Sequence, residues 1–156
     1  MPPKNDGIKV LATNRQAYHN YFIQEKFEAG IELFGTEVKS IRGGHVNLKD
    51  AFCAVKSGEL YVYNMHISPY EQGNVFNKDP MRPKRLLMHK KEIRRLQAGT
   101  QQDGLTLVPL SVYLKGSLVK VQISLAKGKK LYDKRESDAK RDADREIRRT
   151  LREKNN

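Results

Sequence analysis

The last thirty residues, from Lys127 to Asn156, contain almost no side chains that a hydrophobic core could use. Twelve of them are Lys or Arg, seven are Asp or Glu, and neither Gly nor Pro follows Gly128. Such a segment buries too little apolar surface to offset its ordering entropy, although its residues favour helix. The packed fold must therefore come from the preceding residues. Residues 127–156 are predicted to form a basic C-terminal tail that is disordered when free.

If this tail becomes helical, its basic side chains gather on one face. At about 100° per residue, one stripe contains Lys134, Arg141, Arg145, Arg148 and Arg152, and the opposite side contains Ala139, Ala143, Ile147 and Leu151. A face of this kind suits the phosphates of a nucleic acid, so the tail is expected to become helical when it binds one. A solvated single helix held by ion pairs between residues four apart is the alternative interpretation.

The net charge of +12 is divided between the tail, which carries five of the excess positive charges, and residues 1–126, which carry the other seven. The body of the chain is therefore also expected to bind a polyanion, with nucleic acid the first choice and an anionic membrane surface the second. No apolar run is long enough to span a bilayer, and the N-terminus has no apolar signal core. Cys53 is the single cysteine and lies in an apolar run, which fits a packed residue in a reducing, cytoplasmic protein.

Short alternating segments predict a mainly β domain over residues 14–126, preceded by a flexible N-terminal arm over residues 1–13. Strands are expected at 21–34 with an interruption at Gly30, and at 51–55, 60–67, 111–114 and 117–126. A short helix should be capped by Thr36 and end at Gly43, and another should cover 89–99 and end at Gly99. Antiparallel hairpins of this kind predict a small OB-like closed barrel with about three short helices.

Two further features are candidates for contact with nucleic acid. Residues 81–95 contain seven basic residues and one acid and could clamp phosphates, unless Leu86 and Leu87 are core residues and the basic groups are simply solvated. Tyr18 and Tyr132 stand beside basic residues outside the regular strands, where a ring can stack on a base.

Catalytic and metal sites have no comparable signal. The four histidines lack the spacing of metal ligands, and Cys53 has no cysteine partner, so neither a metal site nor a cofactor is predicted. The sequence has no glycine-rich phosphate loop, nucleophile elbow or pair of carboxylates. An enzyme would have to use His19 or His66 with an unmarked partner, and the chain is therefore predicted to be a binding protein.

A series of specific motifs runs in order from about Asn14 to Arg135, and includes EAGIELFGTEVKSIRGG (28–44), GELYVYNMHISPY (58–70), KRLLMHKKEI (84–93), GLTLVPLSVYLKG (104–116) and LAKGKKLYDKR (125–135). In these motifs the chain resembles the SmpB family of SsrA-binding proteins. The resemblance implies an OB-type barrel that acts as a monomer. It also implies a protein that binds the tRNA-like domain of transfer-messenger RNA in place of the anticodon arm. Such a protein delivers that RNA to stalled ribosomes for trans-translation, and its tail becomes helical in the decoding centre and the empty mRNA channel.

The same resemblance implies two sets of functional residues. The RNA-binding face of the barrel would include Asn14, Arg15, His19, Glu28, Gly30, Lys84, Arg85, Leu87 and Lys120, to which the stacking argument adds Tyr18. Gly128, Lys129, Lys130, Tyr132, Asp133, Lys134 and Arg135 match the decoding-centre element, and Arg141, Arg145, Arg148 and Arg152 are assigned to the mRNA channel by composition. Because a carboxylate repels phosphate, Glu28 would have to accept from a base amino group or fix a neighbouring basic side chain, unless it is a surface charge without a role.

The sequence departs from the family pattern at two positions, and two alternative functions remain open. Many family members have His at the position of Tyr132, and a tyrosine cannot titrate near neutral pH. Many also have an aromatic residue at the position of Ala143. A structural ribosomal or initiation-type barrel protein bound to rRNA is the alternative binding function, and an RNA hydrolase is the alternative enzyme.

Overall fold

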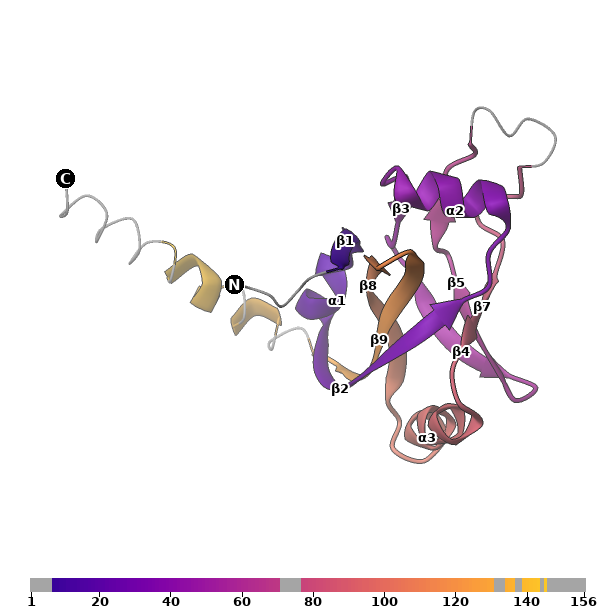
Figure 1. The fold of residues 1–156 in the computed structure, drawn as a ribbon. Helices are drawn as coiled ribbons and strands as arrows, with labels where there is room; N and C mark the ends of the chain where they lie inside the picture. The colour runs from indigo at the N-terminus through magenta and orange to yellow at the C-terminus, as the bar shows by residue number, and fades with distance from the viewer. Residues whose placement is uncertain (1–6, 71–76, 131–133, 137–138, 144, 146–156) are drawn as a thin grey trace, which may run out of the picture.

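The computed structural model describes residues 7–70, 77–130, 134–136, 139–143 and 145. The described residues before the tail form nine strands and three helices (Figure 1). In chain order the elements are β1 (Ile8–Thr13), α1 (Arg15–Asn20), β2 (Tyr21–Ile31), α2 (Gly35–Arg42), β3 (Val46–Asn47), β4 (Phe52–Lys56), β5 (Glu59–Tyr63), β6 (His66–Ile67), β7 (Lys84–Leu87), α3 (Lys90–Gln101), β8 (Thr106–Lys115) and β9 (Leu118–Gly128).

The main sheet is antiparallel, and the pairing of its strands forms a ring of hydrogen bonds. Its strand order is β1-β8-β4-β5-β7-β2-β9, and β9 also pairs with β8, so six strands form a ring with β1 added at the edge of β8. Strands β3 and β6 form a separate pair. The prediction of a mainly antiparallel β fold with a few helices is confirmed.

One hydrophobic core fills the inside of this ring. Leu60, Leu86 and Ile123 come from three different strands and are almost fully buried. Helices α2 and α3 lie across opposite ends of the strands, as Figure 1 shows, and contribute Ile41 and Leu96 to the same core. The alternation of apolar and polar residues along the strands produces this core, because successive side chains point to opposite faces.

Helix α1 packs on the outside of the ring and forms a second, smaller cluster. Ala17 contacts a group made by Val108, Leu110 and Ala126. The helix begins at Asn14, whose Oδ1 accepts a hydrogen bond of 3.2 Å from the backbone N–H of Ala17. Packing and capping together hold this six-residue helix in place.

Both predicted hairpins are present. Strands β4 and β5 are joined by Ser57-Gly58, and β8 and β9 by Gly116-Ser117. Gly58 and Gly116 have φ of +78° and +62°, a backbone conformation that glycine adopts without strain.

The sheet contains residues on both sides of the segment 14–126 that was predicted as the domain. Residues 8–13 are strand β1, which pairs with β8 from Ile8↔Lys115 to Thr13↔Ser111. Strand β2 runs through Gly30 without interruption, and β9 continues two residues past Ala126 to Gly128. In each case the pairing partner is distant in sequence, so the local pattern contained no sign of it.

The helix ends differ from prediction for local reasons. Helix α2 begins at Gly35, because the carboxylate of Glu37 accepts from the backbone N–H of Phe34 at 2.9 Å, and Thr36 therefore lies inside the first turn. Helix α3 continues past Gly99 to Gln101. Gly99 is a packing position, since a Cβ there would lie 2.8 Å from Cδ1 of Leu125.

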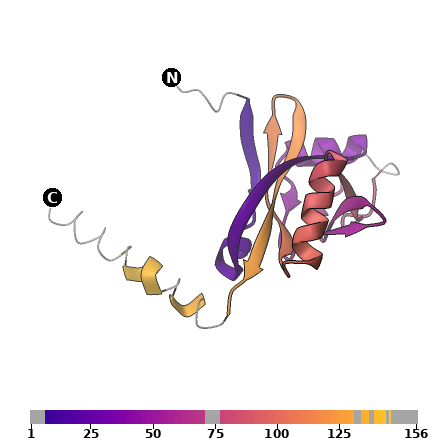
Figure 2. The ribbon, with the colours of Figure 1, turned by 90° about the horizontal axis from the view of Figure 1, so that it is seen from below.

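Beyond Lys130, the described residues of the tail are 134–136, 139–143 and 145, and they have helical backbone. Arg145 lies 3.9 Å from Asp142 in an ion pair. Figure 2 shows this part of the chain extending away from the strands. Of the predicted tail residues, Tyr132, Asp133, Arg148 and Arg152 lie outside the described part of the chain.

Candidate RNA-binding face

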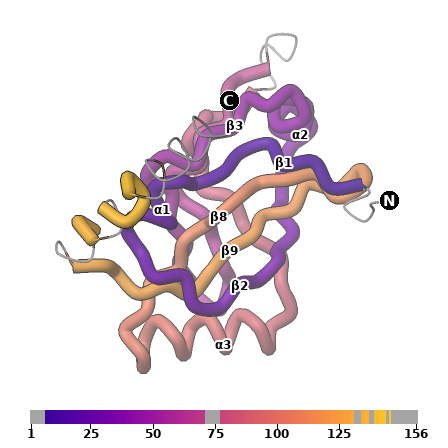
Figure 3. The backbone as a smooth tube through the Cα atoms, turned by 90° about the vertical axis from the view of Figure 1, so that its left-hand side faces the viewer, coloured from indigo at the N-terminus to yellow at the C-terminus, as the bar shows by residue number. Residues whose placement is uncertain are grey.

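Five residues on five neighbouring strands form one row across the sheet, which we call the outer row. Direct register partners connect them in the order Leu87, Gly30, Lys120, Tyr113 and Val10. Figure 3 shows four of these strands, β1, β8, β9 and β2, side by side. The row brings together Gly30, Leu87 and Lys120, three of the predicted RNA-binding residues.

The outer row faces away from the core. The residues that precede or follow its members in the chain, Leu86, Val112 and Val121, are 1%, 0% and 0% exposed. Because side chains alternate along a strand, the row itself lies on the opposite, outer face. Leu87 and Val10 are exposed, and the ammonium group of Lys120 makes no hydrogen bond within the described residues. The row therefore offers apolar and cationic groups together.

Gly30 has no side chain at its position in this row, between Leu87 and Lys120. A Cβ placed there would lie 3.4 Å from Cβ of Leu87, which is close packing. Without a side chain at this position, the backbone of β2 stays accessible between Leu87 and Lys120. A ligand can approach a backbone closely only at such a site.

Glu28 lies two residues before Gly30 on the same face and is already engaged. The hydroxyl group of Tyr113 donates to Oε2 of Glu28, and Nζ of Lys115 lies 3.4 Å from Oε1. The hydrogen bond from Tyr113 is the largest influence that lowers the pKa of Glu28, with Lys115 and Lys120 acting in the same direction. Burial and the bond to Glu28 raise the pKa of Tyr113. Glu28 thus accepts from Tyr113 and pairs with Lys115 in this structure.

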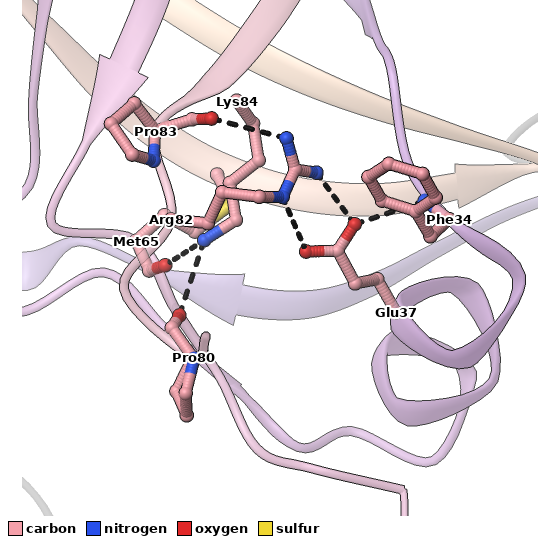
Figure 4. Close-up of polar contacts among 7 residues, drawn as sticks. All are labelled: Phe34, Glu37, Met65, Pro80, Arg82, Pro83 and Lys84. Atoms are coloured by element: carbon pink, nitrogen blue, oxygen red, sulfur yellow. Dashed lines mark hydrogen bonds and ion pairs between the residues drawn. The ribbon is translucent and has the colours of Figure 1, made fainter. Parts of the chain in front are cut away.

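Lys84, another residue predicted for this face, lies on the core side of β7. Its side chain is 0% exposed, and Nζ donates to the backbone oxygens of Met65 and Pro80, the latter at 3.2 Å (Figure 4). Burial lowers the pKa of Lys84 to about 8, opposed by the nearby Glu37. A side chain placed inward on β7 cannot contact phosphate without leaving the core.

Contacts next to Lys84 hold the segment that precedes β7, residues 78–83, against α2. Figure 4 shows the guanidinium of Arg82 beside the carboxylate of Glu37, to which it donates at 2.6 Å. Arg82 and Lys78 also lie 4.9 and 4.4 Å from the ring centre of Phe34. Two basic residues of the predicted clamp and its neighbourhood therefore hold the chain against α2.

Asn14 and Arg85 have internal partners as well. Asn14 is 7% exposed, caps α1 and donates from Nδ2 to the backbone oxygen of Pro109 at 2.9 Å. Arg85 is exposed and forms ion pairs with Glu59 at 3.2 Å and Glu32 at 3.8 Å. Surface pairs of this kind are weak, so a phosphate can compete for Arg85 but not for the buried Asn14.

Helix α1 and the tail meet at a second basic site, which we call the α1 hollow. It has a volume of about 300 Å³ and is lined by Arg15, Tyr18, His19 and Arg141. The base of the tail is joined to this helix, because the backbone N–H of Lys129 donates to the oxygen of Asn20 at 2.8 Å. Three predicted residues of the body and one of the tail thus share a site.

Sequence reasoning missed Tyr113, Lys115 and Val10. Tyr113 belongs to an apolar strand and carried no local signal, and its role depends on the register of β8 against β9 and on the distant Glu28. Val10 was placed in the supposed arm. Within the described residues, three or more His, Cys, Asp or Glu side chains do not gather in a way that could hold a metal ion.

The helices of the described chain are too short or too polar to cross a membrane. Cys53 is buried, and burial raises the pKa of its thiol, so it is a packed core residue as predicted.

Comparison with known proteins gives a consistent result. The family model described as "SmpB protein" matches residues 11–153. The SsrA-binding protein of Caldicellulosiruptor saccharolyticus is 64% identical over 150 residues, which cover 96% of this chain and 95% of that protein. The SsrA-binding protein of Caldanaerobacter subterraneus subsp. tengcongensis is 57% identical over 154 residues, which cover 99% and 98%.

A solved structure is similar in fold as well as in sequence. Its description reads "tmRNA-SmpB: a journey to the center of the bacterial ribosome", and one of its chains is 48% identical to this one. The match covers 80% of this chain and 86% of that chain, with a TM-score of 0.64.

Proposed function

The chain belongs to the SmpB protein family, and from this membership we propose that it binds SsrA RNA, the transfer-messenger RNA, and works with it on the ribosome in trans-translation. Its function is RNA binding and not catalysis, and it needs no cofactor. We place it in the cytoplasm, where ribosomes and transfer-messenger RNA are found.

The ring of strands is proposed to be an OB-type barrel whose outer face receives the tRNA-like domain in place of an anticodon arm. The observation that carries this proposal is the outer row, where Gly30, Leu87 and Lys120 adjoin across three strands with Glu28 beside them. The α1 hollow extends the basic surface through Arg15, Tyr18 and His19. Arg85 is proposed to exchange its carboxylate partners for phosphate.

The tail is proposed to serve the ribosome, and the barrel to serve transfer-messenger RNA. Gly128, Lys129 and Lys130 would lead into the decoding centre, followed by the element from Tyr132 to Arg135. The stripe of Lys134, Arg141, Arg145, Arg148 and Arg152 would face rRNA phosphates in the empty mRNA channel. Neutralisation of this stripe by RNA would offset the cost of ordering the tail, which is expected to be disordered when free.

Competition binding tests the proposed function directly. The purified protein should keep labelled transfer-messenger RNA in complex in the presence of excess ordinary tRNA. Equal competition by tRNA would show general affinity for polyanions and would contradict the proposal. A resident ribosomal protein should instead sediment with all ribosomes, independent of transfer-messenger RNA. Intact RNA after prolonged incubation would exclude a hydrolase.

A further inference from the structure

A groove on another side of the barrel carries the features of a binding site for a single nucleobase. It has a volume of about 410 Å³ and lies between α1 and the residues that lead into β4. Its lining residues come from α1 and its N-cap, from the starts of β2 and β8, and from residues 50–52. None of these lining residues belongs to the outer row or to the α1 hollow. The volume is in the range of sites that hold small organic ligands.

The lining combines apolar surface with aromatic rings. Ala17, Ala51 and Val108 are almost fully buried, whereas Phe52 is 42% exposed and Tyr21 is half-buried. The ring of Phe52 stacks on Tyr63 with ring centres 5.2 Å apart and planes inclined by 17°. An exposed aromatic ring whose orientation is fixed by a stacked neighbour can stack on a planar ligand such as a nucleobase. Any of the four bases can stack on such a ring, so stacking alone does not select the base.

The polar groups of the groove have unused hydrogen-bonding capacity. Within the described residues, the side chains of Gln16, Asp50 and Thr106 make no hydrogen bond or ion pair. Asp50 is held in position by its backbone, which has φ of +60° and whose oxygen accepts from Nδ2 of Asn64 at 3.3 Å. Its carboxylate is thus exposed, held through its backbone, and without a partner among the residues that the structure describes.

The chemistry of Asp50 selects among possible ligands. A carboxylate repels phosphate and can only accept hydrogen bonds when ionised. Guanine presents two adjacent donors, N1–H and the N2 amino group, on its Watson–Crick edge, whereas adenine, cytosine and uracil present one donor group there beside an acceptor. Only guanine can therefore satisfy both carboxylate oxygens at once. An unpaired base is needed, because pairing would occupy the same edge.

We propose that this groove holds one unpaired guanine of an RNA, stacked against Phe52 and donating from N1 and N2 to the carboxylate of Asp50. The proposal rests on the proposed RNA-binding function and adds a base-specific site to it. The guanine can come from transfer-messenger RNA or from rRNA, since the groove recognises the base and not its source.

Kethoxal footprinting tests the proposal, because this reagent modifies N1 and N2 of unpaired guanines. Wild-type protein at saturating concentration is probed with transfer-messenger RNA alone and then with transfer-messenger RNA on stalled ribosomes. One guanine is expected to be protected by the wild type and exposed with Asp50→Asn or Phe52→Leu. Asp103→Asn removes another exposed carboxylate, which lies outside the groove and pairs with Arg95 at 3.9 Å, and it should leave the protection intact. The RNA that contains this guanine identifies its source.

Replacing that guanosine with inosine, which lacks the N2 amino group, provides the second measurement. The wild type should bind the inosine RNA about tenfold more weakly, and Asp50→Asn should bind both RNAs equally. Absence of any Asp50-dependent guanine in either complex would overturn the proposal while leaving RNA binding itself intact. Loss of every footprint in Asp50→Asn would also overturn it, because a single-base site cannot account for complete dissociation. Failure of the wild type to bind either RNA would overturn the proposed function instead.

Discussion

The carboxylate of Glu28 on β2 accepts a hydrogen bond from the hydroxyl group of Tyr113 on β8, across the strand β9 that lies between them. The bond joins two strands that do not pair with each other. It also leaves the second oxygen of Glu28 facing Lys115. The acidic residue of the candidate RNA-binding face therefore organises the basic and aromatic groups around it.

Tyr113→Phe removes this bond with little change in packing. We expect the free energy of unfolding to fall by about 1 kcal/mol, at the low end for a bond to a charged group because Glu28 is 38% exposed. Since the pKa of Glu28 is lowered in the folded state, its contribution is present above its unfolded pKa of about 4.3 and is lost as pH falls through the folded value. Urea unfolding at pH 7 and pH 3 measures both effects, with Tyr61→Phe as control. A difference between wild type and Tyr113→Phe that is as large at pH 3 as at pH 7 would contradict this account.

Lys120 and Lys84 are expected to differ in their effect on RNA binding. Lys120→Met removes a cation from the outer row, so it should weaken binding to transfer-messenger RNA and reduce the slope of log K against log salt by about one. Lys84→Met alters a buried residue and should leave that slope unchanged in the folded protein. Filter binding at several salt concentrations measures the slopes. Equal reductions in both variants would show that Lys84 reaches the RNA.

Lys84 is also expected to make stability depend on pH in the alkaline range. Its folded pKa of about 8 lies below its unfolded pKa of about 10.4, so the unfolded chain binds more protons between these values. The stability of the wild type relative to Lys84→Met should therefore rise as pH increases from 8 to 10. Urea unfolding of both proteins across this range provides the test. A constant difference would mean that Lys84 keeps its ordinary pKa when buried.

Gly99→Ala should destabilise the protein although alanine favours helix. A Cβ at this position would lie 2.8 and 2.9 Å from the two Cδ atoms of Leu125, which is fully buried. Overpacking of this kind costs about 1–3 kcal/mol, which exceeds the helix preference of alanine. Thermal unfolding measures the change. Gly35→Ala is the matched control, because a Cβ there meets no atom within 4 Å and stability should be unchanged or higher.

Two truncations should separate the function of the tail from that of the ring of strands. A chain that ends after Lys130 keeps the register pair Tyr21↔Gly128 and the hydrogen bond from Lys129 to Asn20. This variant should therefore keep its stability and its binding to transfer-messenger RNA. It should lose tagging on stalled ribosomes. Ending the chain after Ala126 removes these contacts too and should cost roughly 1–2 kcal/mol more in free energy of unfolding. Normal tagging by the protein that ends at Lys130 would contradict the proposed role of the tail on the ribosome.

The local sequence pattern was sufficient to predict those elements of the fold that a few neighbouring residues specify. The hairpins at Ser57-Gly58 and Gly116-Ser117 are examples, because a turn with glycine in a left-handed conformation is specified by the turn residues and the alternation beside them. The expectation that residues 127–156 contribute little to the core rested on composition alone. The resemblance in motifs also predicted the family correctly.

Tertiary structure alone decided where distant segments meet. Strand β1, the continuation of β2 through Gly30 and the close contact of Gly99 with Leu125 all depend on partners that local periodicity does not contain. Lys84 shows the same limit at the level of a single side chain. Its sequence neighbourhood is that of an exposed basic residue, and the register of β7 between β5 and β2 turns it inward. The charge of a side chain follows from its residue type alone. Its exposure depends on how the strands pair, and strand pairing depends on residues throughout the chain.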